Sequence, residues 1–267
     1  GVEVSHRNLA ASNEARESWY KDPPGRFLLT SSIGFDSSIV GLFWPLVTGG
    51  AIVLAGDARD VDAVIASIRE QRVTHLLMVP SLYRALLERS PDPMPDLRVA
   101  IVAGESCPAA LVDLHARLRL GVELVNEYGP TEASVWATAH RPVPGQVIVP
   151  IGGPIPGVTV RIAGPEGDGA PMGVAGELLI CGPGVVGGYL DDDEATVERF
   201  IDVDGRRWYR TGDVARIHGD VVHFLGRVDD QLNAGGNRLE PAEIEGELLA
   251  VAGMVDVVVA AVGAMLI

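Results

Sequence analysis

THLLMVPSLYRALLERSPDPMPDLRVAIVAGE, residues 74–105, is the stretch of sequence that decides the fold class. Its two ends, 74–80 and 97–105, are short apolar runs typical of buried strands. The segment between them begins after Pro80, and we expect Ser81 to cap a helix there. Strands and helices alternate in this way from residue 30 to about residue 140. The alternation predicts an α/β fold with a parallel or mixed sheet covered by helices.

The pattern changes after about residue 145, where glycine and proline become dense. Short stretches of alternating polarity follow at 158–162, 176–182, 207–213 and 221–227, and a His-Gly-Asp turn separates the last two. These stretches predict a small all-β subdomain, either a barrel or a distorted sheet. A helix over 241–250 and a further strand are expected after it, as at the start of a small α+β subdomain. The expected organisation is therefore three parts, 1–145, 146–228 and 229–267, the last of them truncated.

The composition limits the classes of partner. The net charge is −15, so we do not expect binding to nucleic acid or to an anionic membrane through a basic surface. Small molecules and other proteins are the expected partners. Cys107 and Cys181 are far apart in the sequence and are expected to be buried thiols in a reducing cytoplasm. No signal peptide or membrane span is recognisable, and the abrupt ends of the sequence suggest a fragment.

NEYGPTE, residues 126–132, is the most specific chemical signal in the sequence. Tyr128 offers an aromatic face to a purine, Thr131 a hydroxyl to a phosphate oxygen, and Glu132 a carboxylate to Mg²⁺. AGES, residues 103–106, is a glycine turn after a strand, where backbone N–H groups can face an anion or a flat ring. Each motif is also compatible with an ordinary turn or polar loop, so neither identifies a function by itself.

Motifs further along the chain supply the context. YRTGD places Asp213 after a glycine turn, where a carboxylate can accept both hydroxyls of a ribose. GRVDDQ places Arg227 and Asp229 directly after the β subdomain. The motifs in chain order are GVEVSHRNL (1–9), FDSS (35–38), NEYGPTE (126–132), GELLICGPGVVGGYL (176–190), YRTGD (209–213) and GRVDDQ (226–231). In this order and spacing the chain resembles the adenylate-forming superfamily of acyl-CoA synthetases, luciferases and adenylation domains of nonribosomal peptide synthetases.

The resemblance implies a nucleotide site made by residues that match the family's motifs. Adenine and its nucleoside would lie against Tyr128, Gly104, Glu105, Asn126 and Phe224, and the ribose would be held by Asp213 and Arg227. Thr131 and Glu132, the residues taken as catalytic, would contact the α-phosphate and coordinate Mg²⁺ respectively. Asp229 matches the hinge of the small C-terminal subdomain.

Asp36 distinguishes between branches of the superfamily. In amino-acid-activating members this aspartate pairs with the substrate's α-ammonium group, because a buried cation needs a carboxylate partner. The alternative is that Asp36 caps the helix that follows it. Carried over by position, the family's selectivity residues are Asp36, Ser37, Val40, Leu82, Ile101, Ala103, Glu127, Val135 and Trp136. Most are apolar, which favours a small to medium side chain, whereas Glu127 allows a polar or cationic one.

The resemblance thus implies ATP-dependent activation of an amino acid as its aminoacyl-adenylate, with release of pyrophosphate. The adenylate would pass to the phosphopantetheine thiol of a carrier domain. In the parent protein a carrier domain after this unit, and a condensation domain before it, would settle that context. The family's phosphate loop and catalytic lysine have no counterpart in this sequence, and Asn233 and Gly235 replace two basic residues. We therefore expect the fragment alone to be weak or inactive. An acyl- or aryl-CoA ligase and a non-catalytic module with the same fold are the alternatives.

Overall fold

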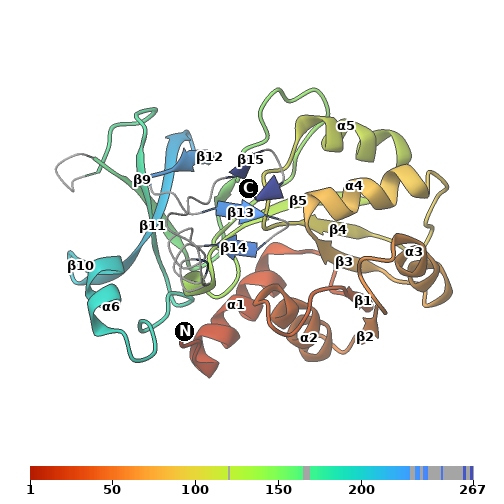
Figure 1. The fold of residues 1–267 in the computed structure, drawn as a ribbon, viewed down its shortest axis with the longest axis horizontal. Coiled ribbons are helices and arrows are strands. Elements are labelled where there is room, and N and C mark those ends of the chain that lie inside the picture. Colours follow the sequence, from red (N-terminus) through yellow and green to blue (C-terminus); the bar gives the residue numbers. More distant parts are fainter. Residues whose placement is uncertain are drawn as a thin grey trace.

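The larger of two main sheets has the strand order β2-β1-β3-β4-β5-β6-β7 (Figure 1). The computed structural model describes residues 1–119, 121–164, 169–228, 232–234, 237–239, 248, 261–262 and 265–266. The strands of this sheet are β1 (Arg26–Leu29), β2 (Ala51–Leu54), β3 (His75–Met78), β4 (Val99–Val102), β5 (Glu123–Tyr128), β6 (Thr138–His140) and β7 (Gly153–Pro154). The first five pair in parallel and the last two antiparallel, so the predicted helix-covered mixed sheet is confirmed.

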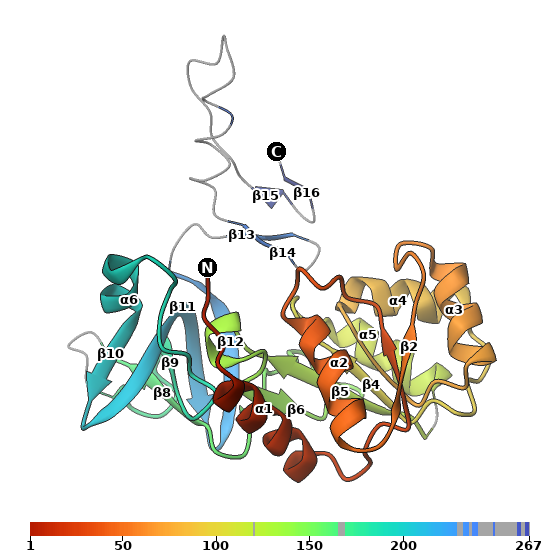
Figure 2. The ribbon, with the colours of Figure 1, turned by 90° about the horizontal axis from the view of Figure 1, so that it is seen from below.

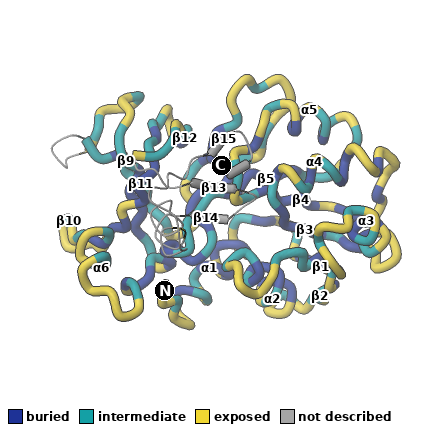
Figure 3. Tube along the Cα trace, viewed as in Figure 1, coloured by how far each residue is buried: buried dark blue, intermediate teal, exposed yellow. Residues whose placement is uncertain are grey.

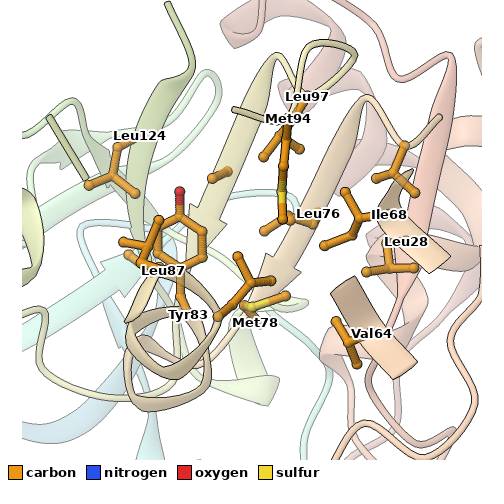
Figure 4. Close-up of a cluster of buried hydrophobic side chains, with 14 of the residues drawn as sticks. Leu28, Val64, Ile68, Leu76, Met78, Tyr83, Leu87, Met94, Leu97 and Leu124 are labelled. Atoms are coloured by element: carbon orange, nitrogen blue, oxygen red, sulfur yellow. The ribbon is translucent and has the colours of Figure 1, made fainter. Parts of the chain in front are cut away.

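Helices cover both faces of the larger sheet, as Figure 1 shows. The helices are α1 (His6–Trp19), α2 (Ser37–Val47), α3 (Val61–Glu70), α4 (Pro80–Arg89) and α5 (Ala109–Leu118). Successive strand residues point to opposite faces. Leu76 and Met78 therefore pack with the apolar sides of α3, α4 and α5, in the core shown in Figure 4. Leu77, between them, packs on the other face with Val40 and Trp44 of α2.

The start of α4 differs from the prediction. The helix begins at Pro80, with Val79 in the N-cap position and no side-chain cap, so the expected cap by Ser81 is wrong. Proline favours the first helical position because its missing N–H would have no partner there in any case. The backbone N–H and the hydroxyl of Ser81 instead both donate to the carboxylate of Glu105, each at 3.0 Å. Ser81 thereby ties α4 to the turn that follows β4.

The smaller sheet is antiparallel, with the order β10-β11-β9-β8 and β12 paired to β11. Its elements are β8 (Thr159–Ala163), β9 (Gly176–Cys181), β10 (Phe200–Val203), β11 (Arg206–His218) and β12 (Val221–Arg227), with helix α6 (Asp193–Arg199) between β9 and β10. Gly219, at φ +61°, makes the predicted tight turn of the β11–β12 hairpin. Figure 2 shows this sheet beside the larger one, with α1 running below both.

Two short strand pairs follow, β13 (Leu232–Ala234) with β14 (Asn237–Leu239) and β15 (Ala261–Val262) with β16 (Met265–Leu266). The predicted hinge Asp229, Gly235 and most of the helix expected over 241–250 lie outside the described residues. Within the described ranges, no helix combines the length and the apolar character needed to cross a membrane. Cys107 and Cys181 are both free and buried, as predicted. Figure 3 shows the buried residues gathered along the central strands.

Candidate active site

A cavity of about 600 Å³ lies where the carboxyl ends of β4 and β5 meet β11 and β12 of the smaller sheet. Ligands of open α/β sheets commonly bind at the carboxyl ends of parallel strands. The residues predicted to bind the nucleotide all line this cavity: Gly104, Glu105, Asn126, Tyr128, Thr131, Asp213, Phe224 and Arg227. Asp36, predicted to meet the substrate's ammonium group, lines the same cavity. Motifs that are far apart in the sequence thus share one site.

Asp213 is at the centre of the polar wall formed by the smaller sheet. The guanidinium group of Arg227 donates to its carboxylate at 2.6 Å, because the two residues lie opposite each other in the β11–β12 ladder. The hydroxyl of Tyr128 donates to the other carboxylate oxygen. Burial and the charge of Asp213 raise the pKa of Tyr128 well above its ordinary value, so the phenol stays protonated and remains a donor.

Asp36 and Thr131 are in direct contact. The Thr131 hydroxyl, in the short 3₁₀ helix η1 (Thr131–Ala133), donates to a carboxylate oxygen of Asp36 at 2.7 Å. Asp36 occupies the N-cap position of α2 but makes no side-chain capping bond, so the alternative role as a helix cap is not what the structure shows. The carboxylate is directed instead towards the turn that carries NEYGPTE. The predicted ammonium ligand and the predicted phosphate ligand are therefore adjacent.

Glu132 is almost completely buried, and its side chain is held by the loop that precedes α6. The hydroxyl of Tyr189 donates to Glu132 Oε1 at 2.7 Å, and the N–H of Val186 donates to the Glu132 backbone carbonyl at 3.0 Å. Burial, followed by the hydrogen bond to Glu132, raises the pKa of Tyr189 above its ordinary value. Over the described residues no group of three or more His, Cys, Asp or Glu side chains is arranged to hold a metal ion. Glu132 lies next to Thr131 but is not among the residues that line the 600 Å³ cavity. As a single carboxylate it could serve Mg²⁺ that takes its other ligands from water and substrate phosphates.

The walls of the cavity on the side of the larger sheet are partly fixed by hydrogen bonds within the protein. Gly104 has φ +83°, which allows the chain to turn sharply after β4 and to present Glu105 to Ser81. The side-chain amide of Asn126 donates to the carbonyl of Pro150 at 2.9 Å. This bond holds the segment after the loop at 147–149, whose three apolar residues also line the cavity. Sequence reasoning missed this loop, although VIV after a glycine turn was a visible signal.

The nine selectivity positions divide into two groups. In one group the residues are partly exposed: Asp36, Ser37, Leu82, Ala103 and Val135. In the other they are buried: Val40, Ile101, Glu127 and Trp136. Of the nine, all of them in the described part of the chain, Asp36 and Glu127 line the 600 Å³ cavity. The larger apolar members pack in the cores on the two faces of the sheet instead: Val40, Leu82, Ile101, Val135 and Trp136.

Glu127 already has partners from the protein. The guanidinium group of Arg16, on α1, binds it bidentately at 2.6 and 2.9 Å, and the Tyr20 hydroxyl donates to the same carboxylate. Both side chains of this ion pair are nearly inaccessible to solvent. The polar partner that the sequence suggested for Glu127 is therefore met within the chain. Arg16 and Tyr20 were missed because nothing in a helix so distant in the sequence marks them as its neighbours.

Comparison with known proteins identifies the family to which the chain belongs. Residues 1–190 match the family model described as AMP-binding enzyme. The chain is 42% identical over 230 residues to novobiocin biosynthesis protein H of Streptomyces niveus, a match that spans 84% of this chain and 37% of that protein. It is 36% identical over 260 residues to bacitracin synthase 3 of Bacillus licheniformis, which spans 95% of this chain and 4% of that protein. The chain therefore covers only a small part of the length of these relatives.

Solved structures show the same fold. The Vibrio cholerae adenylation domain AlmE, in complex with glycyl-adenosine-5'-phosphate, superposes with a TM-score of 0.88 at 29% identity, covering 97% of this chain and 51% of that one. An artificially fused adenylation–PCP di-domain of a nonribosomal peptide synthetase from Klebsiella oxytoca gives 0.86 at 25% identity, covering 97% and 54%. The motifs, the cavity that they line and these matches lead to one conclusion: the chain belongs to the AMP-binding enzyme family, within the adenylate-forming superfamily.

Proposed function

We propose that the protein uses ATP to activate an amino acid as its aminoacyl-adenylate, releases pyrophosphate, and passes the aminoacyl group to the phosphopantetheine thiol of a carrier domain. The observation that carries the proposal is that Asp36 and Tyr128 line one cavity. The lining of that cavity includes an aromatic ring with a carboxylate, Tyr128 with Asp213, suited to a nucleoside. It also includes a carboxylate, Asp36, suited to an ammonium group.

The nucleoside end is supported by the arrangement of donors and acceptors. Asp213 is held in place by Arg227 and Tyr128, so a ribose diol would meet a carboxylate that is already oriented. The ring of Tyr128 and the side chain of Phe224 border the space where a purine would lie. Glu105 and the apolar loop at 147–149 border the same cavity. Aromatic and apolar side chains together with a few placed polar groups are what an adenosine moiety requires.

The reacting end is supported by the contact between Asp36 and Thr131. In the proposed reaction a carboxylate oxygen of the amino acid attacks the α-phosphorus of ATP, and the bond to the bridging oxygen breaks so that pyrophosphate leaves with its electrons. Asp36 would hold the ammonium group, and the adjacent Thr131 hydroxyl would donate to an α-phosphate oxygen. Glu132 would hold Mg²⁺, which neutralises phosphate charge when bound. Such chemistry depends on positioning and charge neutralisation more than on a covalent catalyst.

The second half of the reaction follows from the chemistry of the adenylate. The carrier thiol, as its thiolate, attacks the acyl carbon, a thioester forms and AMP leaves. The superposition on a fused adenylation–PCP structure supports a carrier domain as the partner. The small share of its relatives' length that the chain covers supports a longer parent protein as the unit of activity.

The test is ATP–pyrophosphate exchange by the full-length protein, with each proteinogenic amino acid added in turn. Exchange that depends on an amino acid is expected, and Asp36→Ala should lower kcat/KM for that amino acid at least about 100-fold, because an unpaired buried ammonium group is costly. Asp202→Ala, an exposed aspartate on β10, is the matched control. Exchange only with fatty or aryl acids would replace the proposal with a CoA ligase. A full-length protein with no affinity for ATP would be a non-catalytic module.

A further inference from the structure

The deep part of the expected substrate pocket is filled by side chains of the protein itself. Three selectivity positions there, Val40, Ile101 and Trp136, have at most 3% of their surface exposed. They belong to the apolar core beneath α1 and α2. Glu127, the fourth buried position, borders the cavity and is 3% exposed. A substrate held at Asp36 would therefore share the cavity with Glu127, while the other three positions belong to packed core and offer it no open space.

Four residues form this barrier, and we call them the Arg16 cluster: Arg16, Tyr20, Glu127 and Trp136. The Arg16 guanidinium carbon lies 4.1 Å from the centre of the Trp136 ring while its nitrogens bind Glu127. The Tyr20 ring stacks on Trp136 with a centroid separation of 6.0 Å, and its hydroxyl donates to Glu127. The guanidinium group and the carboxylate of the ion pair are thus hydrogen-bonded, and the Trp136 ring is in contact with both Arg16 and Tyr20.

Helix α1 also fixes the turn that carries Trp136. The indole N–H of Trp136 donates to the backbone carbonyl of Ser12 at 3.3 Å, and the Ser12 hydroxyl donates to the carbonyl of Ser134 at 2.9 Å. Ser134 and Val135 have φ values of +58° and +85°, which are unfavourable for residues with side chains. Such a turn persists only where its surroundings hold it, so Trp136 is fixed in position rather than free to swing away.

The charges of the Arg16 cluster cancel. A cationic substrate side chain would have to displace Arg16 from Glu127, and an anionic one would meet a guanidinium group that is already neutralised. A long apolar side chain would have to move Trp136 or separate the buried ion pair. Separating the buried ion pair would leave an uncompensated charge, so the adjustments that break the pair are strongly unfavourable.

Resting on the proposed function, we infer that the Arg16 cluster closes the substrate pocket and restricts the activated amino acid to a short, uncharged side chain, of the size of glycine, alanine or serine. Arg16 and Tyr20 act through Glu127 and Trp136 and are positioning residues for this selectivity. They lie on α1 and at its C-terminal end, outside the nine positions that sequence resemblance assigned to the pocket.

The first experiment is the amino-acid profile of ATP–pyrophosphate exchange by the full-length protein. A small, uncharged amino acid is expected to exceed leucine, phenylalanine, tyrosine, lysine and arginine in kcat/KM by at least about tenfold, the factor that one or two methylene groups produce in a closed pocket. A profile led by a large or charged amino acid would overturn the inference and leave the proposed function standing. No exchange with any amino acid, by a protein that binds ATP, would overturn the proposed function itself.

The second experiment opens the barrier. The paired change Arg16→Met with Glu127→Gln removes both charges at nearly constant volume, so a larger side chain no longer has to separate an ion pair. Trp136→Leu removes ring volume and keeps both charges, although it takes away the ring that the Arg16 guanidinium group contacts. Either variant should raise the leucine-to-alanine ratio of kcat/KM at least about tenfold, through KM for the amino acid, while KM for ATP stays within about twofold. Arg98→Met with Asp22→Asn, an exposed ion pair at 2.9 Å, is the matched control. Unchanged ratios in two folded, active variants would overturn the inference.

Discussion

Replacing Arg16 by methionine should destabilise the protein strongly, because it leaves the carboxylate of Glu127 buried without its cation. The ion pair is bidentate, at 2.6 and 2.9 Å, and its two side chains are 1% and 2% exposed. Among the described residues, Tyr20 would remain as the side-chain donor to this carboxylate. Removing one partner of a buried pair costs about 3–5 kcal/mol. For a chain of this size that corresponds to a fall of roughly 6–20 °C in the melting temperature.

The paired change of Arg16→Met with Glu127→Gln should recover most of this loss. Neutral residues of similar shape avoid the cost of burying two charges, and such replacements are often neutral or stabilising. A double-mutant cycle should therefore give a coupling energy of at least about 3 kcal/mol. The free energies come from urea unfolding followed by tryptophan fluorescence, since the rings of Trp44 and Trp136 lie 5.6 and 4.1 Å from the Arg16 guanidinium carbon.

Two results would refute this reasoning. If Arg16→Met lowered the free energy of unfolding by less than about 1 kcal/mol, the ion pair would contribute no more than an exposed salt bridge does. That result would mean that solvent reaches Glu127. Additive costs in the double variant would mean that the two side chains do not depend on each other. The exposed pair of Arg98 and Asp22 should show no measurable loss of stability when both are neutralised.

Three further predictions concern the nucleotide, the metal and the pH dependence. Asp213→Asn should weaken AMP binding in titration calorimetry by about 10–100-fold, because a charge-assisted hydrogen bond to the ribose contributes roughly 1.5–3 kcal/mol. Tyr189→Phe should raise the Mg²⁺ concentration for half-maximal pyrophosphate exchange by about tenfold, since loss of a group that orients a metal ligand such as Glu132 typically has that effect. Burial lowers the pKa of His75 from 6.5 to about 4, so the folded protein resists a proton that the unfolded chain takes up readily. The stability that His75 contributes is therefore complete above pH 6.5 and is lost as the pH falls from about 6.5 to about 4. The free energy of unfolding should fall by up to about 1.4 kcal/mol per pH unit in that range. His75→Gln should flatten that part of the plot of urea midpoint against pH.

Each of these predictions has a matched control. Asp220→Asn changes an exposed aspartate in the β11–β12 turn and should leave AMP affinity unchanged. Tyr83→Phe removes a buried hydroxyl that contacts His115, remote from Glu132, and should not alter the Mg²⁺ requirement. Gln71→Ala changes an exposed side chain that carries no titratable proton and should leave the pH profile as steep as before. If a control variant changed the measured quantity as much as the test variant did, the contact assigned to the test residue would not be the cause of the change.

Local signals in the sequence were enough to predict the layered fold. Apolar runs such as the one at 97–105 end in a glycine turn, and segments of helical spacing separate them, so the parallel strands and covering helices follow from periodicity. The candidate nucleotide residues were assigned because their motifs, in this order and spacing, resemble those of the adenylate-forming superfamily. The structure brings them to one cavity because parallel strands end at the same edge of a sheet.

Contacts between distant segments were not predictable in the same way. The residue pattern of α1 does not reveal which acid Arg16 meets, and NEYGPTE does not reveal that the carboxylate of Glu127 is bound by an arginine. Tyr189 belongs to the motif at 176–190, yet its hydrogen bond to Glu132 joins residues 57 positions apart in the sequence and depends on the path of the loop before α6. Ser81 is of a residue type that commonly caps helices, but helix α4 already begins at Pro80, the residue before it. In each case tertiary packing determined the partner.

The ties between α1 and the turn at 134–136 have a consequence for recombination. Residues 12 to 20 and residues 127 to 136 hold one another through an ion pair, a stacked ring and two backbone-directed hydrogen bonds. A chimera whose junction falls between these two segments would take Arg16 from one parent protein and the residue at position 127 from the other. Transfer of substrate specificity between related proteins should therefore succeed when α1, β5 and the turn at 134–136 are all taken from the same parent protein.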